Sequence, residues 1–154
     1  MTPGAAPGRQ TEALQALLIA EHAAIYGLAT AGGRLSALGV NPATVATVAD
    51  TFDQHRLRRD TLVAALTAAH ADVPAALPAY AVPALPSAQA ALQFLGTLSE
   101  RTAAAYREQL APLQTESYRR LAVTAVVAAA RFHTAMLTAA GKNPAAASMA
   151  LPGS

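Results

Sequence analysis

The residues of this chain that are able to do chemistry gather at two places, Glu21 and the polar run from Gln54 to Asp60. Alternating steps of three and four through residues 45–66 pick out an apolar stripe with two ionisable members in its middle. The stripe consists of Val45, Val48, Phe52, His55, Arg59, Leu62 and Leu66. A helix that buries this stripe takes an imidazole and a guanidinium into the core, where unpaired charge is strongly unfavourable. The rest of the chain must therefore supply an acid.

Glu21 is the acid that the pattern indicates. It lies at the centre of an earlier apolar stripe, within about 20° of Leu14 and Leu28 on a helical wheel. We therefore expect Glu21 to be the counter-ion of His55 or Arg59. Glu21 and Arg59 would lie at a similar distance from the same end of the bundle if the two helices are antiparallel.

Three uses stay open for Glu21 and His55: a structural ion pair, a metal site, or a small-molecule site. An ion pair needs only one partner for each charge, whereas a metal site needs ligands that the chain does not offer at a suitable spacing. Asp60, next to the inward Arg59, is expected to pair with an arginine. We favour the ion-pair interpretation.

Apolar periodicity and local start and stop signals predict four long helices. Asn41 followed by Pro42 is a strong helix start, and Gly141 is typical of a helix end. The expected helices are about Thr11 to Leu38, Pro42 to His70, Ala88 to Leu110 with Ser87 as a cap, and Glu116 to Ala140. His22 and His133 lie near the edges of their stripes and are expected at the boundary of the core.

A proline-rich segment, residues 71–87, separates the second and third predicted helices. Its prolines are Pro74, Pro78, Pro83 and Pro86. In an extended polyproline conformation it would reach about 50 Å, more than the roughly 42 Å of the preceding helix. We therefore predict a crossover along the bundle instead of a tight turn. Tyr80 is expected to anchor this crossover through its ring.

The composition fits one domain of packed helices and argues against several classes of function. The chain has 154 residues, of which 53% are hydrophobic and 13% charged. The absence of cysteine excludes disulfides, thiol catalysis and thiolate metal sites. A formal charge of +2 provides a smaller basic surface than nucleic-acid binding needs.

The apolar runs and the termini predict a cytoplasmic protein. By a count of uninterrupted apolar residues, no run reaches the roughly 18 that a membrane span needs. The first ten residues lack the apolar core of a signal peptide. Residues 1–10 are expected to form a disordered arm, residues 11–140 a helical bundle, and residues 141–154 a disordered tail.

Three motifs in this order resemble an actinobacterial ferritin-like family of unknown function. They are Glu21–Gly27, His55–Asp60 and Ala79–Pro83, and the resemblance spans about residues 12–140. It implies an all-α, ferritin-like four-helix bundle that forms a dimer and has no established activity. The alanine- and arginine-rich composition fits a high-GC actinobacterial source.

The resemblance extends to a wider superfamily whose di-iron members use a glutamate on each of two helices and a Glu-x-x-His on each of the others. Glu21 and His55 match this set, but Phe52 stands where a carboxylate would precede His55, and Ser99 replaces the acid of the third helix. The inward positions of the fourth helix are Ala122, Ala125 and Ala129. Most of the expected ligands are therefore missing.

We predict a non-catalytic helical protein, without a cofactor, that acts as a homodimer or through a protein partner. The residues expected in its buried polar cluster are Glu21, His55, Arg59, Asp60 and Ser99. The alternative is an oxidoreductase-type site in which Glu21 and His55 bind iron, manganese or a small ligand, with water or a second subunit supplying the missing ligands.

Overall fold

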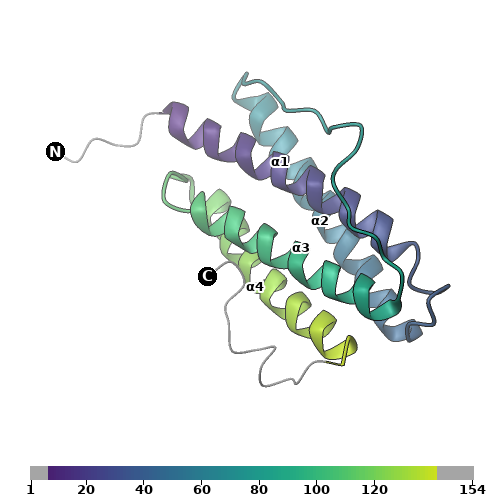
Figure 1. Cartoon of the computed structure of the whole chain (residues 1–154). Helices are drawn as coiled ribbons and strands as arrows, with labels where there is room; N and C mark the ends of the chain where they lie inside the picture. The colour runs from purple at the N-terminus through teal and green to yellow at the C-terminus, as the bar shows by residue number, and fades with distance from the viewer. Residues whose placement is uncertain (1–6, 142–154) are drawn as a thin grey trace.

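The computed structural model describes residues 7–141, and within them it contains four long helices and no strand. The helices are α1 (Pro7–Gly32), α2 (Pro42–Ala68), α3 (Ala88–Glu108) and α4 (Glu116–Ala139). In Figure 1 they lie side by side, α1 next to α2 and α3, and α3 next to α4. The fourth side is looser, since α2 and α4 approach each other at few points. The predicted all-α architecture of four helices is confirmed.

Local signals account for most of the helix ends. The side chain of Asn41 accepts a hydrogen bond from the backbone N–H of Ala43, and that of Ser87 accepts one from Ala90. Gly141 ends α4 with a φ of +85°, a conformation that glycine adopts without strain. These three predicted ends are confirmed.

The first helix differs from its prediction at both ends. It begins at Pro7 because proline suits the first turn of a helix, so residues 7–10 are not part of a disordered arm. The side chain of Gln10 also accepts hydrogen bonds from the backbone N–H groups of Gln114 and Thr115. The helix ends at Gly32, short of Leu38. Residues 1–6 and 142–154 lie outside the described part, so the rest of the predicted arm and tail stays a prediction.

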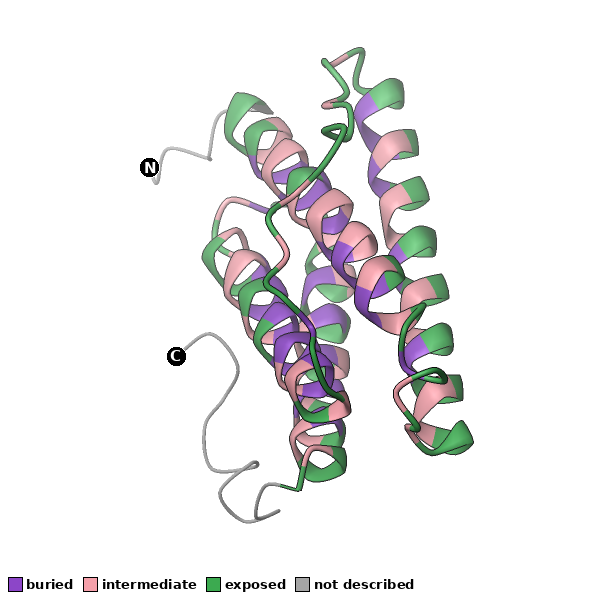
Figure 2. Cartoon of the chain, turned by 45° about the vertical axis from the view of Figure 1, so that its right-hand side comes forward, coloured by how far each residue is buried: buried purple, intermediate pink, exposed green. Residues whose placement is uncertain are grey.

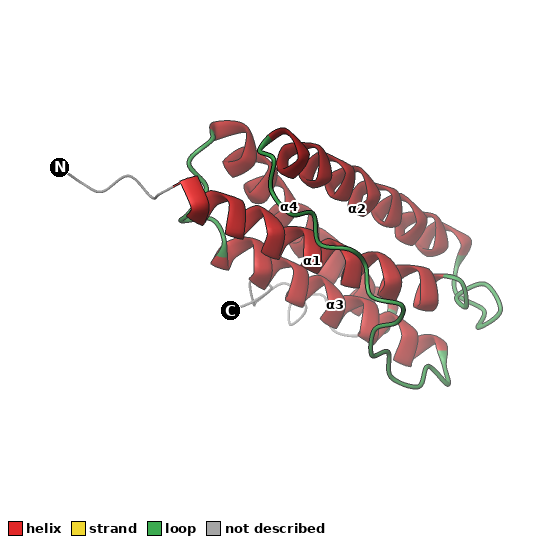
Figure 3. Cartoon of the chain, turned by 90° about the horizontal axis from the view of Figure 1, so that it is seen from above, coloured by secondary structure: helices red, strands yellow, loops and turns green. Residues whose placement is uncertain are grey.

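The connection between α2 and α3, residues 69–87, runs alongside α1 (Figures 1 and 3). Three contacts mark its path: Gln15 with Asp72, His22 with Pro74, and Tyr26 with Tyr80. The residue numbers rise along both segments, so the connection follows α1 from its N-terminal half toward its C-terminal half. As a result α2 and α3 both run antiparallel to α1.

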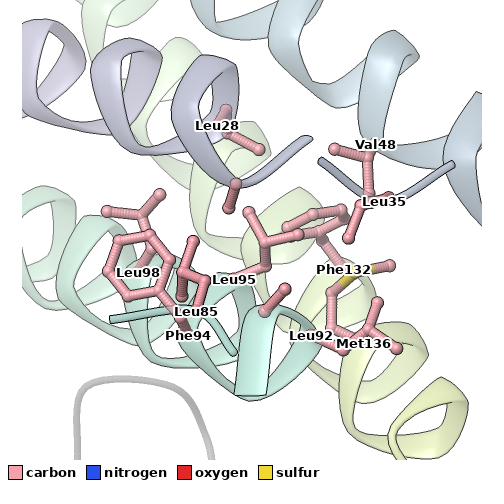
Figure 4. Packing of buried hydrophobic residues seen from close by; sticks show 12 residues of the cluster. Leu28, Leu35, Val48, Leu85, Leu92, Phe94, Leu95, Leu98, Phe132 and Met136 are labelled. Atoms are coloured by element: carbon pink, nitrogen blue, oxygen red, sulfur yellow. The ribbon is translucent and has the colours of Figure 1, made fainter. Parts of the chain in front are cut away.

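The buried side chains form two apolar clusters at opposite ends of the helices. Figure 2 shows the buried positions recurring along each of the helices. One cluster is drawn in Figure 4 and includes Leu28, Leu35, Val48, Leu95, Phe132 and Met136. The other includes Leu14, Leu17, Leu62, Leu66, Leu113 and Ala125. Along α1 and α2, the buried polar residues Glu21 and His55 fall between the two clusters. The core is therefore apolar at both ends and polar in the middle.

Two of the helical segments, Gly8–Gly32 and Glu116–Ala139, are long and apolar enough to cross a membrane. The prediction from uninterrupted apolar runs overlooked them because it took no account of average hydropathy. Buried residues make up 44% and 33% of their most apolar windows. Core helices of soluble proteins meet the same criteria, so a cytoplasmic location stays a prediction.

Candidate functional site

The carboxylate of Glu21 lies in the middle of the core with no exposed surface and accepts three hydrogen bonds. His55 Nδ1 donates to Oε2 at 2.5 Å. Arg58 Nε donates to Oε1 at 2.9 Å, and the hydroxyl of Tyr106 donates to the same oxygen at 2.6 Å. We call these four residues the Glu21 network. Each carboxylate oxygen has at least one strong donor.

Three helices position this network. Glu21 comes from α1 and the fully buried Tyr106 from α3. His55 and Arg58 are three residues apart on α2, a spacing that places two side chains next to each other on one helix face. The network therefore joins α1 to both of its neighbours.

The charges of the network keep one proton off Glu21 and one proton on Tyr106. Burial raises the pKa of Glu21, but the hydrogen bond and charge of His55, the charge of Arg58 and the Tyr106 hydroxyl outweigh it, so the pKa lies below its ordinary value. Burial and the Glu21 charge raise the pKa of Tyr106 well above its ordinary value of 10.0. At neutral pH the network thus contains a carboxylate and a neutral phenol.

The predicted pairing of Glu21 with His55 is correct, whereas the pairing with Arg59 is wrong. Arg58 fills that place, and Arg59 binds Asp60 at the surface, at 2.8 Å. The residues three and four positions after His55 both adjoin it on the helix surface. Periodicity alone therefore could not decide which arginine meets Glu21.

The remaining members of the predicted cluster lie elsewhere. Asp60 pairs with an arginine as expected, but its side chain is 62% exposed and does not belong to the buried cluster. Ser99 is buried, and its hydroxyl donates to the backbone carbonyl of Ala129 at 2.6 Å, which links α3 to α4. Neither residue contacts the Glu21 carboxylate among the interactions of residues 7–141.

Two functional contacts were missed by the sequence reasoning. The sequence reasoning assigned no hydrogen-bonding role to Tyr106, although a buried phenol normally needs a polar partner. His133 was expected at the boundary and is instead only 6% exposed. Its Nδ1 donates to the backbone carbonyl of Gly96 at 3.0 Å, and Nε2 lies 3.9 Å from Glu100.

Tyr80 contacts the bundle as predicted. Its ring centroid lies 5.4 Å from that of Tyr26 on α1, with the rings tilted by 52°. Its hydroxyl accepts a hydrogen bond from the backbone N–H of Leu77 at 3.0 Å. The ring fixes the connection to α1, and the hydroxyl stabilises a local turn.

The residues around Glu21 do not fit the di-iron centre found in members of the wider ferritin-like superfamily that the motifs resemble. Within residues 7–141 no group of three or more His, Cys, Asp or Glu side chains is placed to bind a metal ion. A cation at Glu21 would also stand beside the Arg58 guanidinium, which already donates to Oε1. Phe52 and Ser99 offer no carboxylate at the expected positions.

Comparison with known proteins identifies the family to which this chain belongs. The profile of the family described as a domain of unknown function (DUF4439) matches residues 13–154, so the chain belongs to this family. It is similar to a solved structure described as a conserved hypothetical protein, rv2844, from Mycobacterium tuberculosis, with 32% sequence identity and a TM-score of 0.75. The match covers 86% of this chain and 97% of that one. No curated protein matches the chain.

Proposed function

We propose that this chain is a non-catalytic, ferritin-like helical module that works by assembly, as a homodimer formed through the outer face of α4. The ferritin-like assignment rests on the connectivity. A long proline-rich connection joins α2 and α3, which run in the same direction, and one crossover of this kind is characteristic of ferritin-like bundles. The Glu21 network then serves to hold three helices in one register.

The non-catalytic part of the proposal is supported by the state of Glu21. Its carboxylate is fully buried and engaged by donors from its own chain, including a guanidinium that repels metal cations. The rival function is an iron or manganese site at Glu21 and His55. Metal analysis of the purified protein distinguishes the two, because stoichiometric iron or manganese would contradict our proposal.

The assembly part is carried by a second stripe on α4, which points away from the core. Its members follow one another at steps of three and four: Glu116, Arg120, Val123, Val127, Arg131 and Thr134. Val123 and Val127 are 51% and 45% exposed. The ten residues 121–130 carry no charge at all. Apolar side chains at such spacing suit packing against another helix.

The charges at the two ends of this α4 stripe favour a second copy of the same chain as the occupant. An antiparallel pairing of two α4 helices about a two-fold axis near Val123 would bring Glu116 opposite Arg131 of the partner subunit. Within residues 7–141 of its own chain, Arg131 has no ion-pair partner. Closed two-fold dimers are also the commonest soluble oligomers.

The test is the solution mass by light scattering at micromolar concentrations. We expect twice the 15.7 kDa of one chain. The double variant Val123→Glu/Val127→Glu should have the mass of one chain, whereas the control Leu57→Glu, which changes a more exposed apolar side chain on α2, should remain a dimer. Circular dichroism checks that each variant is folded.

A charge exchange examines the proposed orientation. Arg131→Glu should weaken the dimer, and adding Glu116→Arg should restore it, because the two charges meet only across an antiparallel interface. A wild-type mass of one chain, or a dimer that survives both valine substitutions, would contradict the proposal.

The proposal also places the protein in the cytoplasm, free of nucleic acid and membrane. It is supported by the small net charge of +2 and by the polar network that α1 contributes to the core. Cell fractionation with an antibody checks it, and recovery with the membrane pellet would contradict it.

A further inference from the structure

We propose that the hollow between α1, α3 and residues 80–82 binds a small carboxylate with an apolar body. This site is separate from the Glu21 network and from the outer stripe of α4. Its volume is about 260 Å³. Pockets for drug-sized ligands begin near about 300 Å³, so the occupant is a small molecule with a single ring or a short chain.

The walls of the hollow are apolar and partly aromatic. Alanines 20, 23 and 24 of α1 line one side, where longer side chains would fill the space. Phe94 and Leu98 of α3 also line the hollow, as do the contacting rings of Tyr26 and Tyr80. The apolar body of a ligand would pack against these rings, because ligand pockets are usually lined by hydrophobic and aromatic side chains.

The helices α1 and α3 pack closely at Gly27, which also lines the hollow. A Cβ atom added at Gly27 would lie 2.7 Å from Leu98 Cδ2 and 3.3 Å from Phe94 Cζ. Glycine at this position therefore allows the two helices to approach closely beside the hollow. The connection crosses above them, with Tyr80 attached to Tyr26.

Arg101 provides the charge that selects an anion. Among the described residues it is the single charged one that lines the hollow, and none of the described lining residues is an acid. Within residues 7–141, Arg101 has no hydrogen-bond or ion-pair partner, whereas Glu21, Asp53, Asp60 and Glu116 are all paired with other arginines. A guanidinium binds a carboxylate through two parallel N–H donors, and this geometry distinguishes it from a neutral group.

A second, more open hollow meets the first at Arg101. It lies between residues 81–84 and α3, has a volume of about 620 Å³, and is also lined by Gln93 and Thr97. Both hollows share four lining residues: Ala81, Val82, Phe94 and Arg101. The guanidinium is thus reached from solvent through the wider hollow, while the apolar body enters the narrower one.

The probes are 3-phenylpropionate and its neutral counterpart 3-phenylpropanol, titrated against the full chain and followed by protein-observed NMR. We expect the acid to bind at least about tenfold more tightly than the alcohol, since only the acid meets the charge of Arg101. Resonances of Tyr26, Tyr80 and Phe94 should shift on titration.

Three variants assign the interaction. Arg101→Gln should reduce the affinity for the acid about tenfold and leave that for the alcohol unchanged. Ala23→Leu should abolish binding of both, because the leucine fills the hollow. Arg34→Gln, which removes the same charge from an exposed turn, should change neither affinity.

The proposal is overturned if the acid and the alcohol bind equally, since the hollow would then be a general apolar surface. It is also overturned if neither binds at millimolar concentration, or if Arg101→Gln leaves the affinity for the acid unchanged. Thermal melting of each variant establishes that it is folded. If Ala23→Leu does not fold, the affinity of Arg101→Gln for the acid still tests the proposal, because this substitution lies at the surface.

Discussion

Two adjacent arginines of α2 form ion pairs of nearly the same length in opposite environments. Arg58 lies 2.9 Å from Glu21, and the two side chains are 14% and 0% exposed. Arg59 lies 2.8 Å from Asp60, and those side chains are 29% and 62% exposed. Distance alone would rank the two pairs as equal.

Their surroundings make them unequal. An exposed pair is screened by water and contributes about 0–1 kcal/mol to stability. Removing one partner of a buried pair leaves an uncompensated charge in the core and destabilises the fold by about 3–5 kcal/mol. We therefore expect the fold to depend on Arg58 and to be nearly indifferent to Arg59, and four measurements examine this contrast.

The largest effect is expected for Glu21→Ala. This change removes the acceptor from His55, Arg58 and Tyr106 together, and we expect the free energy of unfolding to fall by about 3–5 kcal/mol. The measurement is urea denaturation at neutral pH. A loss below about 1 kcal/mol would place the network among the exposed pairs and remove the contrast.

A smaller loss is expected for Tyr106→Phe, which deletes one donor and keeps the ring. Hydrogen bonds to charged groups contribute about 1.5–3 kcal/mol, and Glu21 keeps two other donors. The matched control is Tyr80→Phe, whose hydroxyl bonds only to an exposed backbone N–H and should matter less. Equal losses of unfolding free energy from the two substitutions would show that the buried hydroxyl of Tyr106 contributes no more than the exposed one of Tyr80.

The free energy of unfolding should depend on the network at both acid and alkaline pH. The folded-state pKa of Glu21 lies below the unfolded value of 4.5, so its contribution is complete above that pH and is lost as the pH falls through the folded-state pKa. Tyr106 has a raised pKa, so its contribution is complete below 10.0 and is lost as the pH rises through the folded-state pKa.

Two variants assign these two limbs of the stability curve. Glu21→Gln should flatten the loss on the acid side, and Tyr106→Phe should flatten the loss on the alkaline side. Asp60→Asn, at the exposed pair, should leave the curve as it is in the wild type. If the loss of stability at acid pH is unchanged in Glu21→Gln, it is caused by other carboxylates.

The sequence was a good guide wherever the determining physics is local. Asn41 and Ser87 begin their helices and Gly141 ends α4 through local hydrogen bonds and backbone conformation. The stripe periodicity also placed Glu21 and His55 in one core. The choice of Arg58 over Arg59 depends on how α2 is rotated against α1, which is a property of tertiary packing.

The same limit applies to partners that come from distant helices. Tyr106 meets Glu21 across 85 positions of sequence, and only the register of α3 against α1 brings them together. His133 was predicted at the boundary because it lies near the edge of its own stripe, but the glycine at position 96 lets α3 come close enough to bury it. Periodicity describes one helix at a time and does not contain these relations.

The finest test of the contrast compares two double-mutant cycles on the free energy of unfolding. The cycle of Glu21→Ala with Arg58→Ala should give a coupling of about 1–3 kcal/mol, because each residue is the buried partner of the other. The cycle of Asp60→Ala with Arg59→Ala should give a coupling below about 0.5 kcal/mol, because water replaces either partner. Both cycles are run with and without a chelator. A Glu21–Arg58 coupling that appears only without chelator would favour a metal site, and equal couplings in the two cycles would mean that burial does not separate these neighbouring pairs.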